Sequence, residues 1–456
     1  MKKRFLVLSS LLISLQGMAI EVNNLQDWVN KGSAHGNIKY YFIETNKDNS
    51  ATNLSTSAYA HSVGGKLNYT TADFNGFSAG VTFMTTNPFA LPSRVDTSII
   101  GRDNGVRIEN SAGSGTAKKG FAVLGESFIN YKNKNFESWY GRRVIRTPFV
   151  DAKEVRMIPS AVEGGSVAYT FDNGINVGVS YLNRFKQRTS NKFVNIMEHA
   201  LGSNTKAITG KSSGYVIPVD IMWSDKNNKA RIYNYYARDF MNSIYADFEH
   251  KFNTNNDFKY TMALQGIHQN SIGHSRGAMN NNIASYGGKI DSSEFGIKGG
   301  VSYKESVLKL AYTNVLNSSY GEHNSLVMPW DGTPLFTDTI TSNDLFTSNY
   351  GKGLTSAAGY IADTQGVKLT YVQKYNFMDI KGIKSVLAYA RFNNSAFDNT
   401  QQDINAVLSY SKEAFSLSLK GIWTKNNTSN GASDNKSSIS QIDRLVQYRV
   451  IADYTF

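Results

Sequence analysis

The last 11 residues of the chain alternate between apolar and polar positions. Counting back from the C-terminus, every second residue is apolar or aromatic: Phe456, Tyr454, Ala452, Val450, Tyr448 and Val446. The residues between them, which include Arg449 and Asp453, are mostly polar. Alternation over about 10 residues has the length and pattern of a strand that crosses a bilayer at a tilt. We therefore expect the apolar set to face lipid, and Arg449 and Asp453 to face a water-filled lumen.

A strand of this kind leaves an unpaired edge unless its sheet closes, and an exposed edge invites aggregation. If the sheet closes into a barrel, the last strand pairs with the first and no edge remains. An aromatic residue at the end of the closing strand is also typical of outer-membrane barrels. Tyr454 and Phe456 are therefore predicted to act as an assembly signal.

The first 19 residues have the pattern of a secretory signal peptide. A basic stretch at positions 2–4 precedes an apolar stretch at 5–15, and Gly17-Met18-Ala19 has the small-x-small form of a cleavage site. We predict a signal peptide over residues 1–19 and a single β-barrel over residues 20–456.

Composition excludes several other classes of protein. No later stretch has the 18 or more apolar residues of a transmembrane helix, and the mean hydropathy is −0.36. The chain has no cysteine, which excludes disulfides, thiolate metal sites and a lipid-modified cysteine. Its formal net charge of +12 fits either a pore lining that favours anions or scattered surface lysines, and composition does not separate these two interpretations.

The chain consists of paired alternating segments joined by short turns. We predict eight tight turns, near residues 73–76, 132–135, 172–174, 225–228, 253–256, 304–306, 376–379 and 411–413. With a first strand near 36–43 and the last strand, these turns predict 18 strands. The opposite connections are long and polar, at 86–119, 187–212, 270–292, 317–363 and 425–438. Short periplasmic turns and long extracellular loops are the asymmetry of an all-β, single transmembrane antiparallel β-barrel.

One alternative of the same class is a general porin of 16 strands. It would lack the pair of strands around 215–223 and 231–236, because Pro218 lies inside the first of them. Proline cannot donate a ladder hydrogen bond, which makes that strand the weakest of the set.

The segment 141–160 differs from the other connections, because it is short and contains four arginines and two prolines. Its charged residues are Arg142, Arg143, Arg146, Asp151, Glu154 and Arg156, with a lysine at 153. Folded into the lumen, it would form a constriction whose guanidinium groups bind carboxylates. On the outside it would be a solvated surface loop. Arg142 and Arg146 are predicted to share one face of their strand and Arg143 to lie on the other, so at most one set can line the lumen.

This segment resembles the third-loop region of the OprD family of substrate-selective outer-membrane porins. The matching features are Tyr140-Gly141, Pro148 and the stretch from Glu154 to Pro159, together with a tyrosine-rich strand at 231–240. The resemblance implies a monomeric barrel of 18 strands. It also implies a narrow pore with a basic ladder on one side and acidic groups on the other, which passes amino acids, small carboxylates or chito-oligosaccharides. On this likeness Arg142, Arg146 and Arg156 are ladder candidates, with Asp151 and Glu154 as opposing charges.

Motifs for catalysis are weak. The seven histidines are dispersed without the spacing of a zinc site, and there is no Gly-x-Ser-x-Gly elbow. We therefore expect no enzyme activity, no metal and no cofactor. The expected partners are small polar or anionic solutes, outer-membrane lipids and the barrel assembly machinery, not nucleic acid. The sequence predicts a passive, partly selective porin in the outer membrane of a Gram-negative bacterium. A barrel enzyme and an adhesin are the alternatives from other classes.

Overall fold

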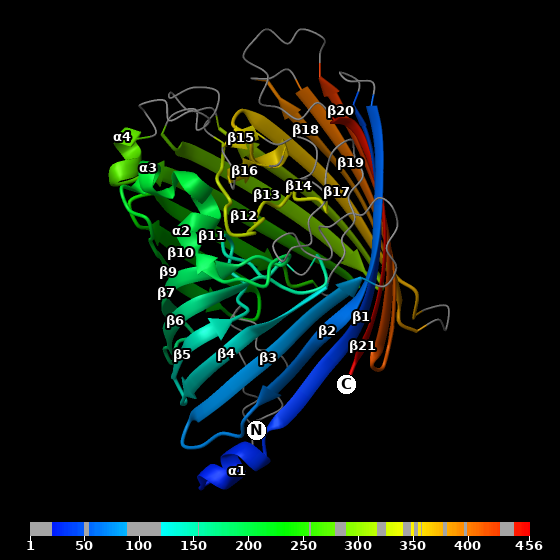
Figure 1. The fold of residues 1–456 in the computed structure, drawn as a ribbon. Helices are drawn as coiled ribbons and strands as arrows, with labels where there is room; N and C mark the ends of the chain where they lie inside the picture. Colours follow the sequence, from blue (N-terminus) through cyan, green and yellow to red (C-terminus); the bar gives the residue numbers. More distant parts are fainter. Residues whose placement is uncertain are drawn as a thin grey trace.

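The strands of the chain form one closed antiparallel barrel in the computed structural model (Figure 1). The structure describes residues 21–49, 54–88, 120–153, 155–254, 257–278, 289–316, 325–340, 348–350, 354–356, 358–376, 381–395, 399–428 and 442–456. The predicted signal peptide at 1–19 lies outside the described residues, as do most of the predicted loop at 86–119 and parts of the predicted turns at 253–256 and 376–379.

The predicted number of 18 barrel strands is confirmed. They are β1 (Ser33–Asn49), β2 (Leu54–Thr70), β3 (Phe77–Pro88), β4 (Phe121–Lys132), β5 (Phe136–Arg143), β6 (Ala161–Thr170), β7 (Asn176–Lys186), β9 (Val216–Ser224), β10 (Asn228–Ala237), β11 (Met241–Lys251), β12 (Phe258–Ser271), β13 (Asp291–Tyr303), β14 (Ser306–Val315), β17 (Thr364–Lys374), β18 (Ile383–Asn394), β19 (Asn399–Lys412), β20 (Phe415–Thr428) and β21 (Ile442–Thr455). Each pairs with its neighbours along the chain, and β21 pairs with β1.

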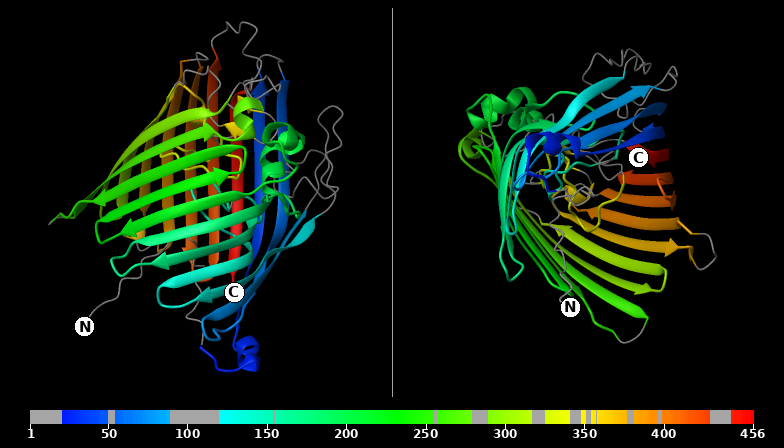
Figure 2. Two further views of the ribbon diagram at one scale, coloured as in Figure 1. Left: turned by 90° about the vertical axis from the view of Figure 1, so that its left-hand side faces the viewer. Right: turned by 90° about the horizontal axis from the view of Figure 1, so that it is seen from below.

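Short elements occupy the two ends of the barrel. Helix α1 (Leu25–Asn30) lies at the end with the short turns, and α2 (Ile196–Leu201), α3 (Thr205–Thr209) and α4 (His274–Ala278) lie at the other end (Figures 1 and 2). The remaining short elements are β8 (Val194–Asn195), β15 (Ser348–Tyr350), β16 (Leu354–Ser356), η1 (Gly202–Asn204) and η2 (Ala358–Tyr360). Within the described part of the chain, no helix is long and apolar enough to span a membrane.

The closing seam joins β21 to β1 through a continuous ladder. Tyr454 lies opposite Ile38, and the backbone amides of Phe456 and Gly36 each donate to the other's carbonyl oxygen at 2.9 Å. Residue 36 must be small, because a Cβ atom there would lie 2.5 Å from the Phe456 ring. The terminal aromatic residue is therefore part of the seam that removes the sheet's free edges.

The two faces of the barrel follow the alternation of the strands. Outward-facing side chains such as Leu67, Val81 and Ile129 are apolar and exposed. Inward-facing side chains such as Thr82 and Gln447 are polar and buried. Since residues opposite each other on neighbouring antiparallel strands share a face, this assignment extends around the barrel.

Strand β9 contains Pro218, and the structure shows how the ladder accommodates it. Pro218 pairs with Tyr235 of β10. On the β7 side, the register passes from Val179 opposite Val219 to Leu182 opposite Val216 and skips the proline. Pro218, which has no amide hydrogen to donate, thus lies where the ladder between β7 and β9 is interrupted. The 16-strand alternative is wrong, because both strands that it would omit belong to the barrel.

Part of the barrel interior is packed like the core of a soluble protein. Inward-facing Tyr233 and Tyr235 of β10 and Tyr245 of β11 belong to a buried cluster with Trp330 and Phe149. The same cluster contains residues of α2 and α3 and of the segments 145–150 and 326–335. Long connections therefore pack against the inner wall formed by β9 to β12.

Candidate functional site

The connection between β5 and β6, residues 144–160, contacts the inner wall of the barrel on two sides. At its start, the Val144 amide donates to Glu126 Oε1 of β4 at 2.9 Å. Further along, the Phe149 ring lies 4.8 Å from that of Tyr235 of β10, centroid to centroid. The carbonyl oxygen of Val155 then accepts a hydrogen bond of 2.9 Å from the Tyr41 hydroxyl of β1.

A tight turn at residues 146–151 shapes the first half of this connection. Arg146 and Asp151 form a backbone bridge, and the Thr147 amide donates to the Val150 carbonyl at 2.9 Å. Phe149 and Val150 are fully buried, which fixes the turn against the interior cluster. Burial raises the pKa of the Asp151 carboxyl, and the charge of Arg146 opposes that rise.

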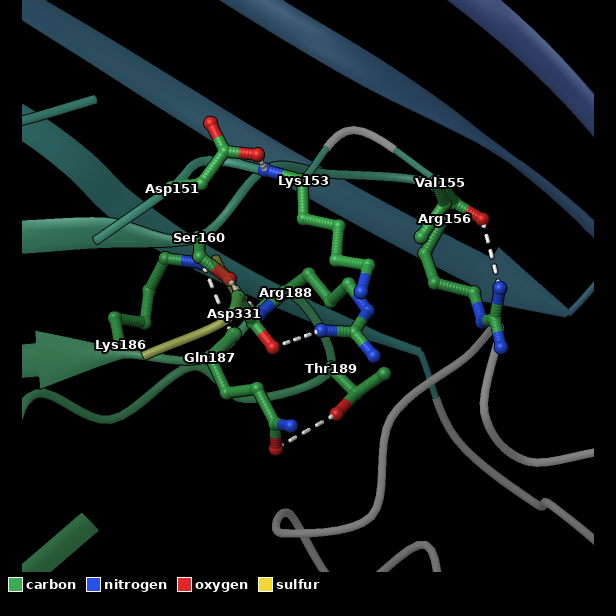
Figure 3. Close-up of polar contacts among 10 residues, drawn as sticks. All are labelled: Asp151, Lys153, Val155, Arg156, Ser160, Lys186, Gln187, Arg188, Thr189 and Asp331. Carbon is green, nitrogen blue, oxygen red and sulfur yellow. Dashed lines mark hydrogen bonds and ion pairs between the residues drawn. The ribbon is translucent and has the colours of Figure 1, made fainter. Parts of the chain in front are cut away.

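Asp331 joins three connections that are far apart in the sequence (Figure 3). Its carboxylate forms an ion pair with Arg188 and accepts a hydrogen bond of 2.6 Å from Ser160 Oγ. The Arg188 amide donates to the same Ser160 oxygen at 2.8 Å. Burial alone would raise the pKa of the Asp331 carboxyl, but the charge of Arg188 and these hydrogen bonds hold it below its ordinary value.

A second contact ties the connection to the end of β7. Lys186 is fully buried, and its Nζ donates to the carbonyl oxygen of Pro159 at 2.8 Å. An amine that leaves water needs such partners, because an unpaired buried charge is costly. The end of the 144–160 segment is thus held by a lysine of β7 and by the Ser160–Asp331–Arg188 contacts.

Beside this segment lies a cavity of about 600 Å³ on the inner face of the barrel. Its charged lining consists of the cations Lys39, Lys66, Arg143 and Arg146 and the anions Glu126 and Asp453. Lys39 Nζ and the Asp453 carboxylate are 3.7 Å apart. The lining therefore has an excess of positive charge, with both signs present within one small volume.

The structure places the predicted arginines on different faces. The Arg143 guanidinium lies 4.7 Å from the centroid of the inward-facing Phe128 ring, so Arg143 faces the interior. Arg142 lies opposite Ser127 and Glu163, on the outward face with the exposed Tyr140. The expectation that Arg142 and Arg146 share a face is corrected, because β5 ends at Arg143 and alternation does not continue to Arg146.

The other predicted site residues lie as follows. Arg156 is nearly buried and donates from Nη1 to the Val155 carbonyl at 2.9 Å, close to β1. Arg449 is buried on the inner face of β21, with its Nε donating to Gln447 Oε1 at 2.6 Å. Tyr454 and Phe456 are exposed on the outer face. Glu154 lies outside the described residues.

Several charged residues of the inner wall were not among the sequence predictions. Lys39 and Lys66 line the cavity, and Lys420 lies opposite Arg449. A signal for Lys39 was present, because Ile38, Tyr40 and Phe42 form an apolar set that would face lipid and leave Lys39 facing inward. Asp331 gave no such signal, since it lies in a long connection without periodicity.

Comparison with solved structures shows the same fold in several porins. The BenF-like porin from Pseudomonas fluorescens Pf-5 matches with a TM-score of 0.71 and 11% identity, over 94% of this chain and 99% of that one. OccK8 (OprE) of Pseudomonas aeruginosa matches with a TM-score of 0.70 and 16% identity, over 94% and 99%. OpdK of Pseudomonas aeruginosa, solved with vanillate, matches with a TM-score of 0.65 and 13% identity, over 93% and 98%.

The family model for OprD, described as an outer membrane porin, matches residues 26–351. No curated protein sequence is significantly similar to the chain. The family model covers well over half of the sequence, and the solved porins share its closed barrel of 18 strands. The chain therefore belongs to the OprD family of outer-membrane porins, and its barrel lies in the outer membrane of a Gram-negative bacterium.

Proposed function

We propose that this porin is a passive channel that favours small anionic solutes, and that the 144–160 segment folds inward as its constriction. The observation that carries the proposal is the cavity lined by four cations and two anions. Two of those cations are Arg143, the last residue of β5, and Arg146, which lies in the segment that contacts both β10 and β1. Charged groups that line a narrow passage focus ions of opposite sign toward it.

Small carboxylates and amino acids are the proposed solutes. A guanidinium group presents a planar pair of donors that matches a carboxylate. Glu126 and Asp453 in the same lining offer an acceptor for the ammonium group of an amino acid. The presence of vanillate, a small carboxylate, in the solved structure of OpdK is consistent with this class of solute.

The site residues of the proposal are Arg143, Arg146 and Arg156 as basic groups, with Asp151 and Glu154 as opposing acidic groups. Arg449 and Asp453 extend the charged lining along β21. We further propose that the barrel acts as a monomer, without cofactor or enzymatic activity. Its partners would then be the solutes, the membrane lipids and the machinery that inserts barrels.

Reversal potentials in a planar bilayer test this function directly. Under a potassium chloride gradient, purified protein should give steady conductance with a reversal potential of the sign expected for chloride preference. Liposome swelling should be faster with gluconate than with mannitol, which has a similar size and no charge. Cation preference, or equal swelling rates for the two solutes, would contradict the proposal. Hydrolytic activity without conductance would favour the barrel enzyme, and cell binding without conductance would favour the adhesin.

A further inference from the structure

Three charged side chains form a cluster on the outward face of β5, β6 and β7. Glu163 lies between two arginines, with Arg142 Nε 2.8 Å from its Oε2 and Arg184 Nε 3.8 Å from its Oε1. The three residues lie opposite one another in the ladder. Tyr140, two residues before Arg142, is 78% exposed and marks this face as the lipid side.

The cluster lies at the extracellular ends of its strands. Strand β5 ends at Arg143 and β6 begins at Ala161, joined by the 144–160 segment, and β7 ends at Lys186 before the long connection that begins at residue 187. A charge on the lipid face costs about 2–4 kcal/mol at the bilayer midplane but only about 0–1 kcal/mol near the interface. The position of the cluster is therefore that of the lipid headgroups in the outer leaflet.

The two arginines differ in what holds them. The Arg142 guanidinium stacks 4.4 Å from the centroid of the Phe193 ring while it binds Glu163. The side chain of Arg184 is half exposed, and its contact with Glu163 is long. Two guanidinium groups against one carboxylate leave one positive charge in excess in the cluster, and Arg184 is the more exposed of the two arginines.

An apolar groove of about 590 Å³ begins directly below the cluster, on the same outer face. Gly165 lies two residues after Glu163 and opposite both Tyr140 and Tyr181, so a gap opens between the two tyrosine rings. Other residues that line the groove are Ile129, Ser138, Val167, Val179 and Ile217. The surface therefore has a cationic end at headgroup level and a continuous apolar end toward the membrane centre.

We propose that this surface binds a phosphorylated lipid of the outer leaflet, with the phosphate on Arg142 and Arg184 and an acyl chain in the groove. Charge complementarity supports a lipid, because the cations lie at one end of the groove and no charged side chain lines the rest of it. Guanidinium groups bind phosphate through charge-assisted hydrogen bonds. The proposal concerns the outer wall and is independent of what passes through the pore.

The first test measures the lipid A that remains bound to the barrel after purification from outer membranes in mild detergent. In the Arg142→Gln/Arg184→Gln variant, bound lipid A per barrel should fall at least about tenfold, as expected for the loss of charge-assisted hydrogen bonds. The matched control is Arg444→Gln. Arg444 is an outward-facing arginine of β21, away from the groove, and its Nε lies 2.7 Å from the carboxylate of Asp48 on β1. Retention by the double variant equal to that of the wild type would overturn the proposal.

Two further variants separate binding from folding. Glu163→Gln keeps both arginines and removes the competing carboxylate, so retention should stay at or above the wild-type level. Ser138→Phe fills the groove and leaves the cations in place, and it should lower retention of fully acylated lipid A. Retention lost in Glu163→Gln, or unchanged in Ser138→Phe, would contradict the assignment. Equal retention of dephosphorylated lipid A, or a lipid-free dimer that the double variant abolishes, would also overturn it.

Discussion

Replacing Arg143 and Arg146 by glutamine should make the pore less selective for anions. Both guanidinium groups line the cavity of about 600 Å³ on the inner wall. The double variant changes the charged lining from four cations and two anions to two of each. The local excess of positive charge is then lost, while the hydrogen-bonding capacity and approximate size of the side chains remain.

The size of the effect follows from the dimensions of the cavity. If the cavity of 600 Å³ were spherical, an ion at its centre would lie about 6 Å from the lining charges, where each contributes about 1 kcal/mol at an effective dielectric constant of about 60. At physiological ionic strength the screening length is about 8 Å, which reduces each contribution by about half. Removing two charges therefore costs an anion about 1 kcal/mol, or about a fivefold change in its local concentration.

The assay is the reversal potential in a planar bilayer under a potassium chloride gradient. The local chloride concentration should fall about fivefold and that of potassium should rise about fivefold, so the ratio of chloride to potassium permeability should fall about 25-fold in the double variant. Arg142→Gln is the matched control, since Arg142 adjoins Arg143 but faces outward and pairs with Glu163. Heat-modifiable migration verifies that each variant is folded. An unchanged reversal potential in the folded double variant would show that permeating ions do not approach these arginines, and would refute the constriction.

Four further outcomes test other parts of the structure. Val177→Arg places a charge on the lipid face of β7 and should destabilise the barrel by about 2–4 kcal/mol, whereas Ser180→Arg, at an inward-facing position, should mainly alter conductance. Equal thermal stability of the two variants would contradict the assignment of these residues to the lipid face and the inner face. Deleting Phe456 removes the last hydrogen-bonded pair of the seam between β21 and β1 and should lower the amount of heat-modifiable barrel in the membrane; normal amounts would exclude an assembly role. Asp331→Ala leaves Arg188, whose side chain is only 17% exposed, without its carboxylate and should weaken the packing of the connecting segments by up to about 3–5 kcal/mol, seen as noisier conductance. Because the pKa of Asp331 is held below its ordinary value, this stabilisation is present above about pH 4 and lost as the pH falls through the lower folded-state pKa, so wild-type conductance should become noisy only in acid.

The strands could be predicted from the sequence because alternation is a local property. Each strand that crosses the membrane must place apolar side chains toward lipid at every second position. That requirement, together with the residues that favour tight turns, predicts the closing strand before Phe456, the hairpin around 172–174 and the total of 18 strands. The same rule places Asp453 inward, where it lines the cavity, and Tyr454 outward.

Alternation ceases to be informative where a strand ends. The face of Arg142 and that of Arg143 depend on which residues pair with β4 and β6, and the direction of Arg146 depends on the turn that begins after Arg143. The sequence singled out this segment by its charge and prolines. The sequence could not show which of its arginines face the lumen, because the residue at which β5 ends was not known.

Only the tertiary structure decided how the connections pack inside the barrel. Asp331 meets Ser160 and Arg188 across separations of 171 and 143 residues, and Trp330 donates from its indole nitrogen to the Ile196 carbonyl at 3.0 Å. These contacts form because buried apolar and charged groups find partners on the inner wall, not because of any local periodicity. Alternation thus determines which face of each strand meets lipid or water, whereas long-range packing decides which of the inward-facing charges line the cavity.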